Sequence, residues 1–166
     1  MRSPECKVMT RAQAVVWREK LRADGRRLAM TNGCFDLLHR GHAEYLAHAR
    51  QTADALLVAI NSDASVRAIK GPERPVVSEQ DRAFMLACLE SIDAVVIFGD
   101  EKPLALFETL VPDVYVKGGD YDIETIVQEE RRLLERLGTS FAFIPFVSGF
   151  STTRTIEKVR GAGGVE

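Results

Sequence analysis

An α/β fold with a parallel sheet is predicted by two observations on this sequence of 166 residues. Short apolar runs alternate with longer segments of helical periodicity, which is typical of parallel strands joined by helical crossovers. One run, residues 55–60, is apolar at every position, as in a strand buried on both faces. The length fits one domain with one substantial core.

Five strands are predicted where apolar runs end in polar or turn-forming residues. The runs cover residues 28–31, 55–60, 94–98, 113–117 and 141–147. Asn32-Gly33 ends the first run, and Gly118-Gly119 ends the fourth. Pro145 lacks a backbone N–H, which indicates that the fifth strand ends at an edge of the sheet.

Helices are predicted between these runs. They cover residues 10–24, 41–51, 78–90, 102–110, 123–137 and about ten residues from Ser151. Gly25 and Gly138 stand where glycine ends helices, Ser78 and Ser151 stand at N-terminal caps, and Pro103 fits a first turn. We therefore expect an N-terminal helical extension over residues 1–26, a domain over 27–160 and a tail over 161–166.

The composition excludes several functional classes. Lys and Arg number 22 against 24 Asp and Glu, so no basic excess favours nucleic acid as a partner. The apolar runs fall far short of the roughly 18 residues of a membrane span, and the first residues lack the apolar segment of a secretory signal. Cys6, Cys34 and Cys88 are widely separated, which is typical of reduced cytoplasmic thiols. We expect a cytoplasmic protein that binds neither nucleic acid nor membrane.

The three histidines fall within ten residues, and two of them directly follow the first strand. His39 and His42 flank Gly41 in a loop where open parallel sheets bind ligands. We expect His42 at a helix start, where free N–H groups attract anions, so the pair suits a polyphosphate. No Cys, Asp or Glu stands at a zinc-ligand spacing beside it. The alternative is a polar loop whose histidines only form turn and cap hydrogen bonds; His48 is expected to be an ordinary helix residue.

The segment Thr31-Asn-Gly-Cys-Phe-Asp-Leu-Leu-His-Arg-Gly-His42 resembles the signature of the cytidylyltransferase-like nucleotidyltransferases, whose hallmark is His-x-Gly-His. Phe150-Ser-Thr-Thr153 resembles their second signature, a Ser/Thr-rich helix start. Three further segments are similar to the adenylyltransferase domains of ADP-heptose synthases: Asn61-Ser-Asp-Ala-Ser, Lys70-Gly-Pro-Glu-Arg-Pro-Val and Val116-Lys-Gly-Gly-Asp-Tyr121. The resemblance covers roughly residues 27–160.

This resemblance implies a single Rossmann-like, doubly wound domain. Its five-stranded parallel sheet is expected in the order 3-2-1-4-5, counted from the strand near residues 27–32. The loops at 33–42 and 117–121 then face each other across the crevice. Many relatives carry a sugar-kinase domain before this one, whereas 26 residues stand here, so we expect a stand-alone transferase that depends on a separate heptose kinase. Association into a homodimer is left open.

The resemblance also implies a reaction: ATP and heptose 1-phosphate give ADP-heptose and pyrophosphate, for the lipopolysaccharide inner core. A sugar phosphate is largely dianionic at neutral pH, because its second pKa is about 6, so it needs no general base. The enzyme must align it with the α-phosphorus and stabilise the departing pyrophosphate. Mg²⁺ bound through the nucleotide phosphates is the expected divalent metal.

The site residues implied by these motifs fall into three groups. The expected catalytic residues are His39, His42, Lys70 in the loop after the second strand, and Arg82 on the following helix. Asp36 and Lys70 are expected to bind the sugar phosphate, with Asp36 also a candidate ligand of Mg²⁺. The expected nucleotide contacts are Asn32, Gly33, Cys34, Phe35, His39, Gly41, His42, Lys117, Gly118, Asp120, Ser151, Thr152 and Thr153.

Each role has a structural competitor, and the function has rivals. Arg82 and Lys70 fit solvated surface positions as well, and Ser151 and Thr152 fit simple helix caps. A dinucleotide-dependent dehydrogenase is disfavoured, because the turn at Gly33 lacks Gly-x-Gly-x-x-Gly. A cytidylyltransferase for glycerol 3-phosphate or another alcohol phosphate shares both signatures. A catalytically inactive nucleotide-binding module is disfavoured by the intact signatures.

Overall fold

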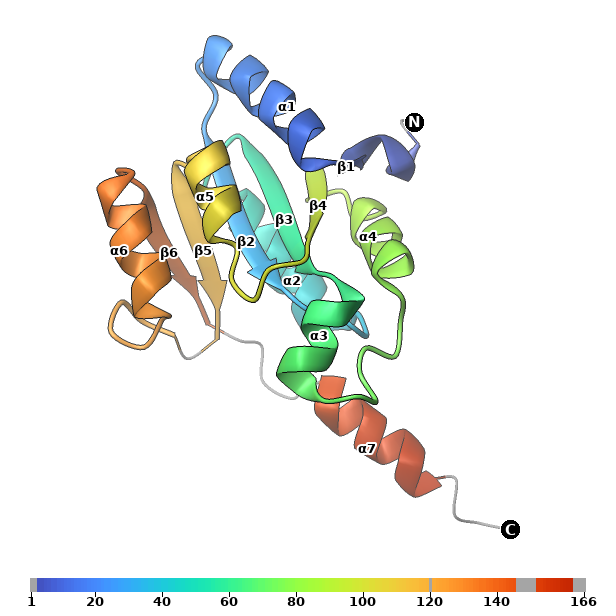
Figure 1. Cartoon of the computed structure of the whole chain (residues 1–166). Coiled ribbons are helices and arrows are strands. Elements are labelled where there is room, and N and C mark those ends of the chain that lie inside the picture. Colours follow the sequence, from blue (N-terminus) through green and yellow to red (C-terminus); the bar gives the residue numbers. More distant parts are fainter. Residues whose placement is uncertain (1–2, 120, 146–151, 163–166) are drawn as a thin grey trace.

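Six parallel strands form one sheet in the computed structural model, which describes residues 3–119, 121–145 and 152–162. The order is β1-β4-β3-β2-β5-β6, and helices cover both faces (Figure 1). The strands are β1 (Val8–Met9), β2 (Leu28–Gly33), β3 (Ala55–Asn61), β4 (Ala94–Phe98), β5 (Val114–Gly118) and β6 (Ser140–Ile144). All five pairings between neighbouring strands are parallel.

Seven α-helices lie among the described residues. They are α1 (Arg11–Ala23), α2 (Arg40–Arg50), α3 (Asp63–Lys70), α4 (Glu79–Ala87), α5 (Leu104–Leu110), α6 (Gln128–Arg136) and α7 (Thr152–Ala162). A short 3₁₀ turn, Pro4–Lys7, precedes β1. No helix in this part of the chain combines the length and apolar character that crossing a membrane requires.

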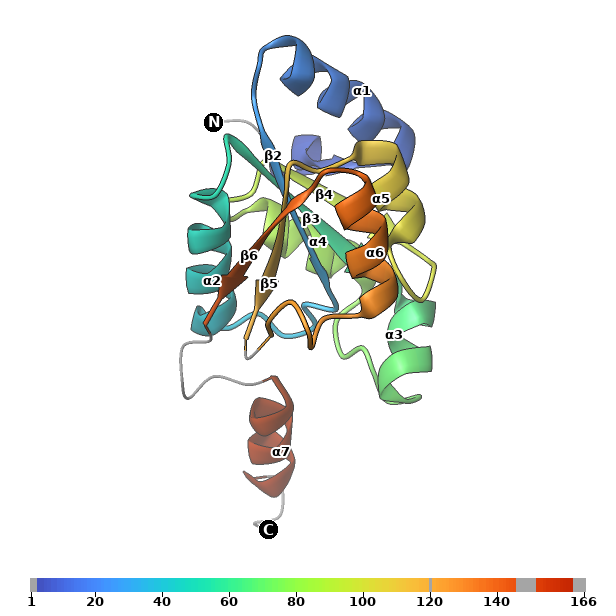
Figure 2. The same ribbon diagram turned by 90° about the vertical axis from the view of Figure 1, so that its left-hand side faces the viewer.

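The core consists of two apolar layers, one on each face of the sheet. Leu28 and Met30 of β2 point into the layer formed with α1, α5 and α6, whereas Ala29 points into the layer formed with α2 and α4. Figure 2 shows α2 on one side of the sheet and α5 and α6 on the other. Every residue of β3 is buried, as expected for a strand covered on both faces. This doubly wound arrangement leaves the carboxyl ends of the strands for the loops that follow them.

The expected sheet of five strands in the order 3-2-1-4-5 is corrected by the structure. The sixth strand is β1, where Val8 and Met9 pair with Val95 and Val96 of β4 at the sheet edge. Without β1, the neighbours run β4-β3-β2-β5-β6. A strand of two residues has no alternation pattern that could reveal it. The N-terminal 26 residues therefore contribute a strand and, through Ala14 and Leu21 of α1, buried core surface as well as a helix.

The sequence interpretation also missed α3 and extended α6 too far. Ser62 caps α3 by accepting the N–H of Ser65, and Gly71, with φ 98°, follows its last residue. Lys70 consequently ends a helix and does not lie in a loop. Before α6, a turn around Asp122 replaces the helix expected from residue 123, because that carboxylate accepts the N–H groups of two following residues. β6 ends at residue 144, and residues 146–147 lie outside the described part of the chain.

The side chain of Tyr45 packs α2 against the carboxyl ends of β2 and β5. Its hydroxyl donates to the carbonyl of Val116 at 3.1 Å and lies 2.7 Å from Thr31 Oγ1. A Cβ at Gly118 would stand 2.7 Å from two carbons of the ring, closer than packed atoms allow. The end of β5 thus needs glycine for close packing.

We predict that Gly118→Ala lowers the free energy of unfolding by about 1–3 kcal/mol, because the ring of Tyr45 must move from a well-packed position. Urea unfolding followed by circular dichroism measures the change. Gly99→Ala is the matched control, because its added Cβ would meet nothing closer than Ser62 Oγ at 4.0 Å. Equal unfolding free energies for both variants would contradict the packing argument.

Candidate active site

The two histidines of the His-x-Gly-His motif lie together at the start of α2. His39 is the N-cap, and its Nδ1 accepts the backbone N–H of His42 at 3.3 Å. Because the cap folds its ring back over the first turn, the two imidazoles stack with centroids 3.8 Å apart and planes 12° apart. Gly41 between them is buried, which lets the turn pack closely. Helix N-termini of this kind attract anions.

Burial keeps this histidine pair neutral at pH 7. Burial, with a smaller contribution from neighbouring His39, lowers the pKa of His42 to about 4. The pKa of His39 is also lowered by burial. Among the described residues nothing bonds the buried Nδ1 of His42, and such an unsatisfied buried atom is uncommon outside functional sites. A bound phosphate would raise both pKa values, because negative charge favours the protonated imidazole.

The turn between β2 and α2 brings the backbone close to this pair. Phe35 has a φ of 46°, and its ring lies 5.3 Å from that of His42. A Cβ at Gly33 would stand 3.0 Å from the ring of Phe35, so glycine suits this position. Burial raises the pKa of the Cys34 thiol, although Lys70, Arg82 and Arg74 oppose that effect. Its Sγ donates weakly to Asn61 at 3.9 Å.

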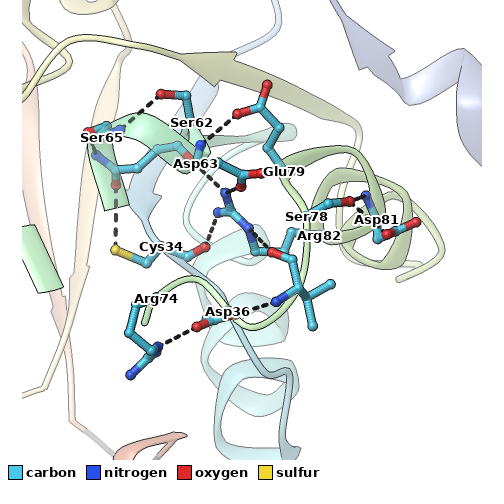
Figure 3. Close-up of polar contacts among 12 residues, drawn as sticks. Cys34, Asp36, Ser62, Asp63, Ser65, Arg74, Ser78, Glu79, Asp81 and Arg82 are labelled. Atoms are coloured by element: carbon cyan, nitrogen blue, oxygen red, sulfur yellow. Dashed lines mark hydrogen bonds and ion pairs between the residues drawn. The ribbon is translucent and has the colours of Figure 1, made fainter. Parts of the chain in front are cut away.

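Arg82 is buried and holds several loops at once, and its expected catalytic role stays a prediction. Its side chain is fully buried. Figure 3 shows the guanidinium between the loop after β2 and the start of α3. It donates to the carbonyls of Val77, Cys34 and Asn61 at 3.0, 2.5 and 2.8 Å, and to Asp63 Oδ1 at 2.8 Å. These contacts make Arg82 a positioning residue for the turn beneath the histidines.

Asp36 is likewise held by protein groups, and its expected roles in substrate and metal binding stay predictions. Its carboxylate accepts from Arg74 Nε at 2.5 Å (Figure 3). It also accepts from the backbone N–H groups of Val76 and Val77. Burial alone would raise the pKa of Asp36, but these three donors outweigh it and lower the pKa. The carboxylate thus holds the loop between α3 and α4 against the loop after β2.

Lys70 and the start of α7 line one cleft beside this loop. The cleft has a volume of about 470 Å³ and is lined by residues 70–74 together with Thr153, Ile156 and Glu157. Thr152 Oγ1 donates to the carbonyl of Leu37 at 3.1 Å, so α7 begins directly against the turn that carries the histidines. Ser151 lies outside the described residues. The hydrogen bond between Thr152 and Leu37 thus joins the two signature segments, and contact of the cleft with phosphate stays a prediction.

Asn32 and Lys117 meet at the carboxyl ends of the neighbouring strands β2 and β5. Lys117 Nζ donates to Asn32 Oδ1 at 2.9 Å, and Tyr115 donates to the same oxygen at 2.7 Å. Glu130 of α6 lies 2.7 Å from the Tyr115 hydroxyl, a partner that the sequence interpretation missed. A signal for it existed, because Glu130 shares the buried face of α6 with Leu133 and Leu134. Asp120 lies outside the described residues.

Protein ligands for a metal do not gather in the described part of the chain. No group of three or more His, Cys, Asp or Glu side chains with suitable placement occurs there, and Asp36 is already saturated by its donors. A resident metal cage does not fit these residues. Mg²⁺ commonly keeps several waters and binds through substrate phosphates, which requires few protein ligands.

Comparisons with known proteins identify the family. The sequence matches the Cytidylyltransferase-like family over residues 30–158. It is 53% identical to the bifunctional protein HldE of Geotalea uraniireducens (strain Rf4), over 89% of this chain and 29% of that protein. The corresponding protein of Koribacter versatilis (strain Ellin345) is 48% identical over 93% of this chain and 31% of its own length.

The chain therefore spans less than a third of the length of these relatives. A crystal structure of the lipopolysaccharide core biosynthesis protein from Thermoplasma volcanium GSS1 shares the fold with a TM-score of 0.61 and 23% identity, covering 74% of this chain and 98% of that one. The family match covers most of the chain and includes both the His39–His42 turn and the start of α7. The chain belongs to the cytidylyltransferase-like family of nucleotidyltransferases.

Proposed function

We propose that this chain is an adenylyltransferase that joins ATP and D-glycero-D-manno-heptose 1-phosphate to give ADP-heptose and pyrophosphate. The observation that carries the proposal is the stacked pair of His39 and His42 at the start of α2. The choice of substrates is supported by 48–53% identity to HldE proteins and by the segments beginning at Lys70 and Lys117. The product would serve the lipopolysaccharide inner core.

In the proposed reaction, a sugar-phosphate oxygen attacks the α-phosphorus of ATP. A new P–O bond forms, and the bond from the α-phosphorus to the bridging oxygen breaks, so that its electron pair leaves with pyrophosphate. The attacking phosphate is largely dianionic at neutral pH, so no residue need remove a proton. The protein supplies alignment and stabilisation of the leaving charge.

The protein groups suited to that task surround the turn after β2. His39 and His42 offer imidazoles at a helix N-terminus, and Thr153 and Lys70 line the adjoining cleft. Arg82 and Asp36 hold the turn from behind, so the phosphate chain meets a preorganised backbone. Mg²⁺ would supply positive charge to the nucleotide phosphates, and none of these side chains is assigned to hold it.

The source of the sugar phosphate, the location of the protein and its oligomeric state are also part of the proposal. A heptose kinase activity must supply the sugar 1-phosphate. A cytoplasmic location follows from ATP as substrate. A homodimer stays an open prediction.

The runner-up is a cytidylyltransferase for glycerol 3-phosphate or another alcohol phosphate, which the family's description favours. A screen of pyrophosphate release, with ATP and CTP against a panel of sugar and polyol phosphates, separates the two. We expect the highest kcat/KM for ATP with the heptose 1-phosphate. Faster turnover of CTP would select the runner-up, and no release with any pair would select an inactive nucleotide-binding module.

We predict that His42→Ala lowers kcat by about 10²–10³-fold, because one preorganised donor to the developing charge is lost. KM for the sugar phosphate should change much less, and circular dichroism should show a folded protein. His48→Ala is the control: this exposed residue of α2 should leave kcat within twofold, about the scatter of such assays. Near-normal turnover in His42→Ala would remove the histidine pair from the mechanism.

We also predict that the acid limb of kcat/KM against pH belongs to the substrate. This parameter reports ionisations of the free reactants, and a sugar phosphate has its second pKa at about 6. His42 titrates at about 4, so it remains neutral while the substrate gains its proton and loses nucleophilicity. A phosphonate analogue with a different pKa should shift the limb by the same amount. A limb that ignores the substrate's pKa would reveal an essential protein group.

A further inference from the structure

A carboxylate that the reaction scheme does not use is buried on α6. Glu130 is 3% exposed and lies on the same helix face as Leu133 and Leu134. The preceding residue, Glu129, is exposed and forms an ion pair with Lys102 at the surface. Removing a carboxylate from water costs several kcal/mol unless partners compensate it. The partners of Glu130 therefore indicate what this charge does.

Glu130 ends a chain of contacts that leads to Lys117. Its Oε2 lies 2.7 Å from the hydroxyl of Tyr115 and 3.8 Å from Nζ of Lys117. The same hydroxyl and the same ammonium both reach Asn32 Oδ1, at 2.7 and 2.9 Å. The ammonium also lies 5.2 Å from the centre of the Tyr115 ring. A flexible lysine is thereby held by an ion pair, a hydrogen bond and an aromatic ring.

This chain of contacts lies at the carboxyl ends of two neighbouring strands. Asn32 is the penultimate residue of β2, and Lys117 is the penultimate residue of β5, its parallel neighbour. β3 and β5 flank β2 on opposite sides, and ligands of open α/β sheets bind where connections diverge in this way. One residue after Asn32 begins the turn that carries the histidines. The ammonium is thus fixed beside the site where the phosphates are proposed to bind.

The negative charge of Glu130 favours the charged form of the Lys117 side chain. Burial lowers the pKa of Lys117, and the negative charge of Glu130 opposes that fall. The other groups facing this ammonium carry no charge at neutral pH: Tyr115 from β5, Tyr121 with its ring centre at 6.0 Å, and Asn32 from β2. Among the described residues, Glu130 is therefore the counter-charge that favours the ammonium form.

We propose that Glu130, together with Tyr115 and Asn32, is a positioning residue that fixes the Lys117 ammonium at the ends of β2 and β5 as a cation for the substrates' phosphates. This inference rests on the proposed nucleotidyl transfer for the identity of the anion. The contact between Glu130 and Lys117 does not depend on the reaction. The two parts can therefore be tested separately.

The first test measures the titration of Lys117 without substrate. Acetic anhydride acylates only the neutral amine, so acylation of Lys117, read by mass spectrometry, reports its midpoint pH. In Glu130→Gln we expect the midpoint to fall by about one unit or more, because an opposite charge nearby shifts a pKa by roughly that amount. Glu129→Gln is the matched control, with the same change on the same helix at an exposed position, and should leave the midpoint in place. An unchanged midpoint in Glu130→Gln would overturn the proposal.

Glu130→Asp covers the case in which Glu130→Gln does not fold. It keeps the charge one methylene further from Lys117, so the midpoint should fall by less than in the glutamine variant but measurably. Circular dichroism identifies which variants are folded. A midpoint in folded Glu130→Asp equal to that of the unaltered protein, with Glu130→Gln unfolded, would reduce Glu130 to a structural role and overturn the proposal.

The second test asks whether Lys117 meets the phosphates. ATP or CTP at saturating concentration should protect Lys117 from acylation, and kcat/KM of Glu130→Gln should fall more at pH 8.5 than at pH 6.5. The expected difference is about tenfold for each unit by which the midpoint of Glu130→Gln lies below 8.5, provided that Lys117 of the unaltered protein is still protonated at that pH. Acylation that nucleotide does not slow would overturn the role toward phosphate. A shifted midpoint with protection, but no transfer in the pyrophosphate screen, would uphold the inference and reject the proposed function.

Discussion

The geometry of the site depends on the hydrogen bonds that the guanidinium of Arg82 donates. The guanidinium binds carbonyls of three separate segments: Val77 before α4, Cys34 after β2 and Asn61 at the end of β3. Carbonyls at the ends of parallel strands have left their ladder and need other partners when buried. One planar cation with several donors satisfies these acceptors together, which a lysine's compact ammonium would not match in geometry. The turn that carries His39 and His42 starts from a backbone fixed in this way.

Asp36 complements Arg82 with the opposite charge. Arg82 donates to carbonyl oxygens, whereas Asp36 accepts from the N–H groups of Val76 and Val77 and from the guanidinium of Arg74. The two side chains hold the same pair of loops through the two kinds of backbone group. The loops are therefore set before a ligand arrives, and a site that needs no rearrangement stabilises developing charge most effectively. In the proposed function, positive charge toward the phosphates comes from Lys70 and Lys117.

Periodicity and apolar runs predicted most helices and strands, because those elements bury a regular face. They could not reveal β1, with two residues, or α3, with eight, since a pattern needs more positions to repeat. The histidine pair was predictable as a pair at a helix start. The roles of Arg82 and Asp36 were not, because a charged residue in a motif fits ligand contact and loop fixation equally well. Only burial and partners distinguish these roles, and they come from residues far apart in the sequence.

The neutral state of His39 and His42 bears on how the pair would stabilise the departing pyrophosphate. Two stacked imidazoles that were both protonated would repel each other, and burial already disfavours the charged form, so the pair carries little charge. A phosphate chain would oppose that effect, because its negative charge favours protonation of the ring it touches. The interaction then strengthens as charge accumulates on the departing pyrophosphate. In the proposed transfer, His42 therefore stabilises the transition state more than the bound substrates, and only such differential binding raises kcat.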